Sequence, residues 1–178
     1  MSTILTNISR IKQNILEAAS MNNFGDKATL VAASKGHSFD LIIEAFNAGI
    51  INFGENYLQE ALDKKLHLER FAIQWHFLGP IQSNKCRLIA ENFDWVHSVD
   101  RIKVMKLLND FRPSNVPPLN ICIQINSSGE DTLNAKEIIQ ETINEIATSY
   151  NLPRHNQKLA ILVRKLFINQ GKCSRYKR

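Results

Sequence analysis

Apolar residues follow two alternating spacings along the first 146 residues. Short continuous apolar runs, typical of strands buried on both faces, alternate with stretches in which apolar residues recur every three or four positions, typical of amphipathic helices. The runs predict strands at 29–33, 50–53, 73–78, 94–99 and 119–125. The helical spacing predicts helices over 4–20 and 135–146, and four more that begin near Ser38, Glu55, Ser83 and Asp100. This alternation predicts a parallel α/β fold.

Five βα units are fewer than a closed barrel needs. An eight-stranded barrel takes about 200–250 residues, whereas this chain has 178. We therefore expect a TIM-barrel-like fold that is incomplete, with about five βα units. The stretch LAILVRKLFIN (159–169) predicts either a sixth strand or a helix. An open barrel would leave unpaired strand edges, which favours self-association.

Charge divides the chain into two parts. Residues 151–178 hold eight Lys or Arg and no Asp or Glu, whereas residues 1–150 hold 14 basic and 17 acidic residues. The net charge of +5 therefore comes from the C-terminal segment. We predict a partial barrel domain over 1–150 and a basic, atypical tail over 151–178. The tail favours nucleic-acid binding, but its only aromatic residues are Phe167 and Tyr176, so we expect no nucleic-acid partner.

Neither a membrane nor a metal is expected as a partner. No apolar run approaches the roughly 20 residues that span a bilayer. Cys86, Cys122 and Cys173 show neither metal-ligand spacing nor the even number that disulfides require. The cysteines therefore indicate a reducing compartment, and we expect the protein in the cytoplasm.

Lys35 directly follows the first predicted strand. Parallel α/β folds place their chemistry at the C-terminal edge of the sheet. An amine in a partly enclosed site there can form an imine with an aldehyde. The alternative interpretation is a solvated surface lysine, and spacing alone leaves both interpretations open.

Four segments of the first 130 residues together form a long signature. They are LVAASK (30–35), INFGENYLQEALDK (51–64), QWHFLGPIQSNKCRLIAENFDWVHSVDR (74–101) and PPLNICIQIN (117–126). In order and spacing they resemble the pyridoxal phosphate homeostasis proteins, whose single domain is a barrel like the N-terminal domain of alanine racemase. The resemblance implies a monomer that holds the vitamin B6 cofactor pyridoxal 5'-phosphate (PLP) as a Schiff base on Lys35. It also implies buffering of intracellular PLP without catalytic turnover.

The resemblance carries over to other polar residues near the same edge. Asn56 matches a family position that lines the mouth of the barrel, and its alternative role is a turn residue that caps the next helix. His76 and His97 lie on the third and fourth predicted strands, and each is favoured as a core or rim histidine with satisfied hydrogen bonds over a catalytic residue, because the spacing places no carboxylate partner. Gln82, Asn84 and Lys85 begin a helix near the mouth, and their alternative role is that of a capped, solvated turn. Lys85 and Arg87 are the candidates to hold an anion there.

The chain also departs from the family pattern. Gly36 and His37 stand where a second lysine is usual, and SSGEDTLNA (127–135) keeps the acidic residues of its loop but lacks the lysine. The family's phosphate-binding serine motif and a later Arg-Ile-Gly segment have no counterpart in residues 151–178. We therefore expect weaker PLP binding, by several kcal/mol, in a chain truncated or frame-shifted after about residue 130.

Two other functions compete with that of a cofactor carrier. A PLP-dependent enzyme of the racemase class needs a second acid/base on the opposite ring face and usually a second domain, and neither is visible in the sequence. An inactive remnant of the family would keep the fold and lose the cofactor. Trapping of PLP on Lys35 separates the remnant from the carrier, and turnover of an amino acid separates the enzyme from both.

Overall fold

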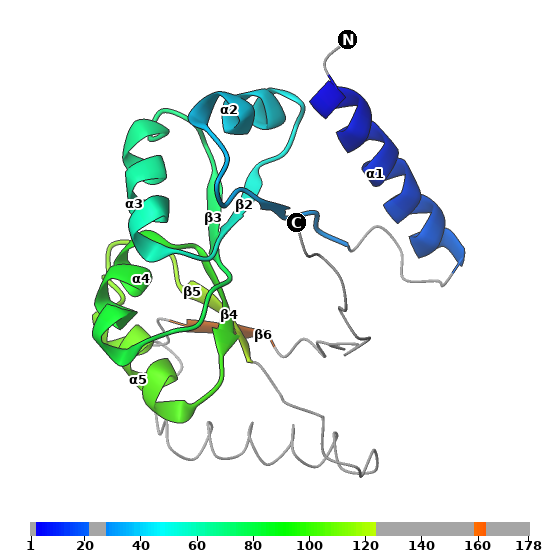
Figure 1. The fold of residues 1–178 in the computed structure, drawn as a ribbon. Coiled ribbons are helices and arrows are strands. Elements are labelled where there is room, and N and C mark those ends of the chain that lie inside the picture. The colour runs from blue at the N-terminus through cyan, green and yellow to red at the C-terminus, as the bar shows by residue number, and fades with distance from the viewer. Residues whose placement is uncertain (1–2, 22–27, 124–158, 163–178) are drawn as a thin grey trace, which may run out of the picture.

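One parallel sheet organises the computed structural model, which describes residues 3–21, 28–123 and 159–162. Six described strands pair in the order β1-β2-β3-β4-β5-β6, so each strand lies beside its neighbour in the sequence (Figure 1). They are β1 (Ala32–Ala33), β2 (Asn52–Glu55), β3 (Gln74–Phe77), β4 (Trp95–Val99), β5 (Leu119–Ile123) and β6 (Leu159–Leu162). The predicted parallel α/β fold is confirmed, and residues 159–162 form a strand.

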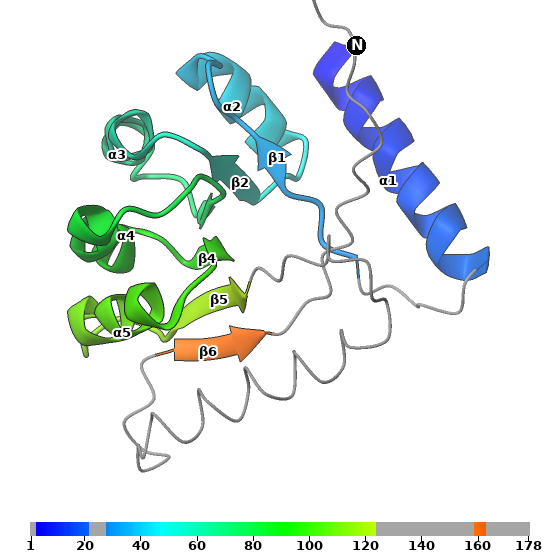
Figure 2. The ribbon, with the colours of Figure 1, turned by 60° about the horizontal axis from the view of Figure 1, so that its bottom comes forward.

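Helices cover one face of this sheet. Figure 2 shows α2 to α5 side by side along the outer face, with α1 beyond the α2 end. The helices are α1 (Thr3–Met21), α2 (Phe39–Asn47), α3 (Leu58–His67), α4 (Cys86–Asn92) and α5 (Ile102–Phe111), and a 3-10 turn, η1 (Ser83–Lys85), precedes α4. Sequential parallel strands joined by helices on one side are the wall of a (β/α) barrel. The helix predicted over 135–146 lies outside the described residues.

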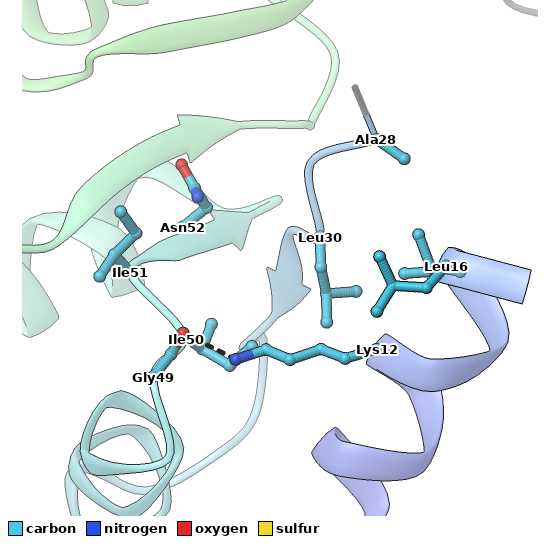
Figure 3. A pocket seen from close by; sticks show the side chains of 9 residues that line it. Lys12, Leu16, Ala28, Leu30, Gly49, Ile50, Ile51 and Asn52 are labelled. Atoms are coloured by element: carbon cyan, nitrogen blue, oxygen red, sulfur yellow. Dashed lines mark hydrogen bonds between the residues drawn. The ribbon is translucent and has the colours of Figure 1, made fainter. Parts of the chain in front are cut away.

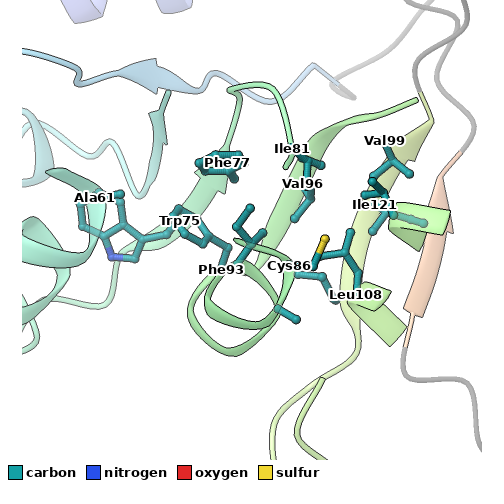
Figure 4. Close-up of a cluster of buried hydrophobic side chains, with 14 of the residues drawn as sticks. Ala61, Trp75, Phe77, Ile81, Cys86, Phe93, Val96, Val99, Leu108 and Ile121 are labelled. Carbon is teal, nitrogen blue, oxygen red and sulfur yellow. The ribbon is translucent and has the colours of Figure 1, made fainter. Parts of the chain in front are cut away.

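Large apolar side chains fill the space between the sheet and these helices. Phe77 of β3 pairs in register with Val96 of β4. Its ring also meets that of Phe93 edge-on, at a centroid distance of 5.2 Å. Other buried members of the cluster include Ala61, Trp75, Cys86, Leu108 and Ile121 (Figure 4). The hydrophobic core therefore lies between the outer face of the sheet and these helices.

The opposite face of the sheet carries smaller and more polar residues. One register row crosses five strands through Ala33, Gly54, His76, Trp95 and Asn120. Successive residues of a strand point to opposite faces, so this row and the row that contains Phe77 and Val96 lie on different sides of the sheet. The inner face is the one that lines the interior of a closed barrel.

The end of β2 differs from its prediction. We predicted a strand over 50–53 and a helix from about Glu55, whereas Glu55 is the last residue of β2 and α3 begins three residues later. Glu55 is fully buried against the ammonium group of Lys64. A hydrophobicity pattern treats a charged residue as exposed, so it ended the strand too early.

Helix ends follow the sequence signals in part. Gly49 follows α2 with φ +82°, the left-handed conformation that glycine adopts easily, and glycine at this place is a sequence signal for a helix end. Ser38 is the N-cap residue of α2, but its side chain makes no capping hydrogen bond. Leu66 of α3 is 69% exposed, although an apolar residue at helical spacing is a signal for burial.

A buried arginine joins α4 to the loop before β5. Nη1 of Arg112 donates hydrogen bonds to the carbonyl oxygens of Ala90 (2.6 Å) and Phe93 (2.8 Å). Nε and Nη2 both donate to the carbonyl oxygen of Pro117, at 2.9 and 2.6 Å. The guanidinium group thus satisfies carbonyls at the C-terminal end of α4 that the helix leaves unpaired.

Candidate cofactor-binding site

Lys35 lies in a tight turn at the C-terminal edge of the sheet. Pairing with β2 extends one residue past β1, because the Ser34 N–H donates to the carbonyl oxygen of Gly54 at 2.9 Å. The His37 N–H donates back to the Ser34 carbonyl oxygen at 3.1 Å, and Gly36 has φ +71°. The Lys35 side chain is exposed. The structure therefore places Lys35 at the edge of the sheet that the sequence predicted.

A buried ion network lies directly beneath this turn. The Lys64 ammonium group donates to the carboxylates of Glu55 (2.7 Å) and Glu60 (2.6 Å) and to the carbonyl oxygen of Ser34 (2.6 Å). The Ser34 hydroxyl donates to the same Glu55 oxygen at 2.7 Å. A lysine has three donor hydrogens, and these three oxygens account for all of them. The network ties α3 and the end of β2 to the residue before Lys35.

The two carboxylates of the network differ in their surroundings. Glu55 is buried, and its second oxygen, Oε2, is a buried polar atom that has no hydrogen-bond partner within the described part of the chain. Glu60 is partly exposed and accepts a hydrogen bond from the Gly36 N–H at 2.6 Å. Hydrogen bonds from Lys64 and from Gly36 lower the pKa of Glu60 from its ordinary value of 4.5.

Asn56 lies in the turn that leads from β2 to α3. Its backbone runs against Gly79, where a Cβ atom would collide with the Asn56 carbonyl oxygen. Tyr57, not Asn56, is the N-cap residue of α3, so the predicted capping alternative is wrong. Asn56 thus follows the strand that neighbours β1, at the same edge of the sheet as Lys35.

His76 and His97 form a hydrogen-bonded pair on the inner face. Their Nδ1 and Nε2 atoms are 2.9 Å apart, and His76 Nε2 lies 3.0 Å from Asn52 Oδ1. When Asn52 Oδ1 accepts from His76 Nε2, a neutral His76 accepts the His97 N–H at Nδ1. The ring of His76 stacks on Trp95 at a centroid distance of 5.5 Å. The favoured interpretation of each histidine as a core or rim residue with hydrogen-bond partners agrees with this geometry, and the bond between the two rings is an additional finding.

The residues around η1 do not form one anion site. Gln82 is the N-cap residue of η1, and Lys85 ends it with an exposed side chain. Arg87 stacks on the ring of Phe111 at 4.5 Å, and its Nη1 lies 3.9 Å from a Glu91 carboxylate oxygen. Arg87 therefore belongs to the outer surface of α4 and α5.

A cavity of about 280 Å³ lies at the other end of the strands. It separates α1 from the segments that lead into β1 and β2, and Leu16, Leu30 and Ile50 contribute apolar lining (Figure 3). The Lys12 ammonium group at its edge donates to the Gly49 carbonyl oxygen at 3.1 Å. Because the cavity opens where the strands begin, it is separate from the Lys35 edge.

Neither a metal cluster nor a membrane-spanning helix occurs within the described residues. Residues 3–21, 28–123 and 159–162 contain no group of three or more His, Cys, Asp or Glu that could hold a metal ion. No helix within these same ranges is long and apolar enough to cross a membrane.

Sequence reasoning missed most of the network that supports Lys35. The apolar spacing alone places Glu55 in a turn and the charges of the following helix on its solvated face. One signal is available, because Glu60 and Lys64 are four positions apart and so lie on the same face of α3. Asn52 falls within the predicted strand 50–53, but a pattern of apolar residues does not identify its hydrogen bond to His76.

The fold and its edge lysine define a parallel (β/α)-barrel class of protein. The family model for the alanine racemase N-terminal domain matches residues 6–151. This chain belongs to that family and, within it, to the pyridoxal phosphate homeostasis proteins.

Two relatives of that name show how much of the family's length is present. The Pseudomonas aeruginosa protein is 52% identical over 132 residues, which are 73% of this chain and 57% of the relative. The Escherichia coli protein is 41% identical over 159 residues, 86% of this chain and 67% of the relative. This chain therefore matches between about half and two thirds of the length of these relatives.

A solved structure with the same fold contains the cofactor. PipY of Synechococcus elongatus, described with PLP bound, superposes with a TM-score of 0.60 at 30% identity. The match covers 83% of this chain and 66% of PipY. PipY without PLP gives a TM-score of 0.62.

Proposed function

We propose that this chain binds PLP as a Schiff base on Lys35 and serves intracellular PLP homeostasis without catalytic turnover. The observation that carries the proposal is an exposed lysine at the C-terminal edge of β1, in a turn whose backbone is bonded to a buried ion network. Its relatives' name and the PLP in PipY support the choice of ligand.

The described residues fit the aldehyde end of such a cofactor. Bound PLP supplies an aldehyde and an electron-withdrawing ring. The neutral Lys35 amine adds to the aldehyde carbon, and loss of one water leaves a C=N bond to Lys35 Nζ. Asn56, at the end of the neighbouring strand, is the second cofactor-binding residue that we propose.

The described residues offer fewer partners for the phosphate group of PLP than for its aldehyde. Lys64, the buried cation nearest to the Lys35 turn in the network, already donates to three oxygens. Phosphate is held by charge-assisted hydrogen bonds. Because Lys64 has no donor hydrogen left for a phosphate oxygen, we propose that PLP is bound weakly, within the partial barrel of residues 1–150.

An absorbance titration with PLP tests this function. Borohydride reduction and peptide mapping then locate the reduced Schiff base. We expect a visible absorbance band with label on Lys35, lost in Lys35→Ala and kept in Lys103→Ala, which removes an exposed lysine of α5. Label scattered over surface lysines would overturn the proposal and favour an inactive remnant.

Two further measurements test the finer parts of the proposal. Incubation with L-alanine and analysis on a chiral column should show no D-alanine, because we propose no turnover. Racemisation would favour the alternative, a PLP-dependent enzyme. Light scattering after gel filtration should give the mass of a monomer, and a larger mass would indicate self-association of an open barrel.

A further inference from the structure

Two side chains of α3 hold the two peptide groups on either side of Lys35. The peptide before Lys35 presents the Ser34 carbonyl oxygen, which accepts from Lys64 Nζ at 2.6 Å. The peptide after Lys35 presents the Gly36 N–H, which donates to Glu60 Oε1 at 2.6 Å. We call Glu60 and Lys64 the α3 clamp. Their separation of four residues places both side chains on the same face of the helix.

The two residues of the α3 clamp, Glu60 and Lys64, are also hydrogen-bonded to each other. Lys64 Nζ donates to Glu60 Oε1 at 2.6 Å, and this is the oxygen that accepts from Gly36. Glu55, the last residue of β2, accepts a further hydrogen bond from Lys64 Nζ. A charge-assisted hydrogen bond is stronger than a neutral one, so the backbone around Lys35 is restrained from both sides.

The turn needs this restraint. Gly36 has φ +71°, and a Cβ built on it would meet no atom within 4 Å, so side-chain packing does not hold the residue in place. Glycine reaches many conformations at low cost. The bond to Glu60 selects one of them, and it thereby fixes the direction in which the Lys35 side chain leaves the backbone.

We infer that Glu60 and Lys64 are positioning residues that preorganise Lys35 for attack on an aldehyde. This inference rests on the proposed function for the role of Lys35, and it assigns the orientation of that residue to α3. Orientation of a reacting group contributes strongly to rate. Loss of the Glu60 contact should therefore slow Schiff-base formation while the sheet stays folded.

Pyridoxal, which lacks the phosphate group, is the probe that isolates the amine end of the site. Cyanoborohydride supplies the hydride that reduces the C=N bond, and mass spectrometry measures the trapping rate at Lys35 relative to exposed Lys103. We expect Glu60→Ala to lower this ratio by about tenfold. Glu60→Gln keeps an oxygen for the Gly36 N–H and should recover part of the loss. Asp63→Asn, a neighbouring charge removal on α3, should leave the ratio within about twofold of the unaltered chain.

The rate of amide hydrogen exchange at Gly36 tests the bond between Gly36 and the α3 clamp in the absence of any aldehyde. We expect exchange at Gly36 to be about tenfold faster in Glu60→Ala and unchanged in Asp63→Asn. Unchanged exchange in Glu60→Ala would overturn the inference, as would faster exchange with an unaltered trapping ratio. If the unaltered chain traps pyridoxal no faster at Lys35 than at Lys103, the proposed function fails, and exchange at Gly36 still decides whether Glu60 holds the turn.

Discussion

The backbone of Asn56 passes so close to Gly79 that no side chain fits between them. A Cβ atom on residue 79 would collide with the Asn56 carbonyl oxygen and also approach its carbonyl carbon at 2.9 Å. The colliding atoms belong to the backbone, so a rotamer change cannot relieve the contact. The loop after β3 therefore sets the path of the residue that follows β2.

Gly79→Ala should displace the turn that carries Asn56. We expect the free energy of unfolding to fall by about 1–3 kcal/mol and PLP binding to weaken, measured by urea unfolding and absorbance titration. Gly36→Asn is the matched control, because space around Gly36 is open and asparagine tolerates positive φ. Equal losses in unfolding free energy for the two variants would contradict this explanation.

Lys64→Met should be strongly destabilising. It leaves the buried Glu55 without its cation, and breaking a buried pair by removing one partner costs about 3–5 kcal/mol. Urea unfolding at neutral pH measures the change, with Lys103→Met on the exposed face of α5 as the control.

A double substitution separates the charge effect from the loss of packing. Adding Glu55→Gln to Lys64→Met removes the stranded buried charge, so part of the stability should return. If the loss of unfolding free energy in the double variant equals the sum of the losses in Lys64→Met and Glu55→Gln, the two residues do not act as a pair.

Acid should loosen the Lys35 turn through Glu60. The folded-state pKa of Glu60 is lowered by its bonds to Lys64 and Gly36, so folding favours the ionised form. Its contribution to stability is present above the unfolded pKa near 4.5 and is lost as the pH falls through the lower folded value. The difference in unfolding free energy between the unaltered chain and Glu60→Gln should be constant near neutral pH and shrink in acid. A difference that does not change with pH would be a contradiction.

Arg112→Met should separate α4 from the loop before β5. The substitution leaves the carbonyl oxygens of Ala90, Phe93 and Pro117 without their donor, and hydrogen bonds to charged groups contribute about 1.5–3 kcal/mol each. We expect a loss of about 3 kcal/mol or more in urea unfolding, without a change in which lysine forms the Schiff base. Arg112→Lys should recover only part, because an ammonium group lacks the planar fork of guanidinium. Full recovery by lysine would contradict the role given to that fork.

The alternation of elements and the place of Lys35 could be predicted because both depend on local signals. Continuous apolar runs marked the strands, and Gly49 marked the end of α2 through a conformation that few other residues adopt. Lys35 followed from the rule that parallel strands present their C-terminal ends at one edge. None of these inferences required knowledge of which distant residues meet.

The support for Lys35 could not be predicted because it depends on tertiary partners. Glu55 reads as a turn residue until Lys64 is known to lie 2.7 Å away. Arg112 reads as a surface charge until three carbonyl oxygens are brought around it. Burial of charge is favourable only with such partners, and a hydrophobicity pattern contains no information about them.

The order of the strands favours folding during synthesis. Each strand from β2 to β5 pairs with the strand made just before it, about 20 residues earlier, so its partner has already left the ribosome. β6 begins at residue 159, whereas β5 ends at residue 123, and joining them closes a longer loop. Loop-closure entropy rises only slowly with length, by about 0.6 kcal/mol per doubling. A nascent chain can therefore complete the Lys35 turn and α3 well before β6 emerges.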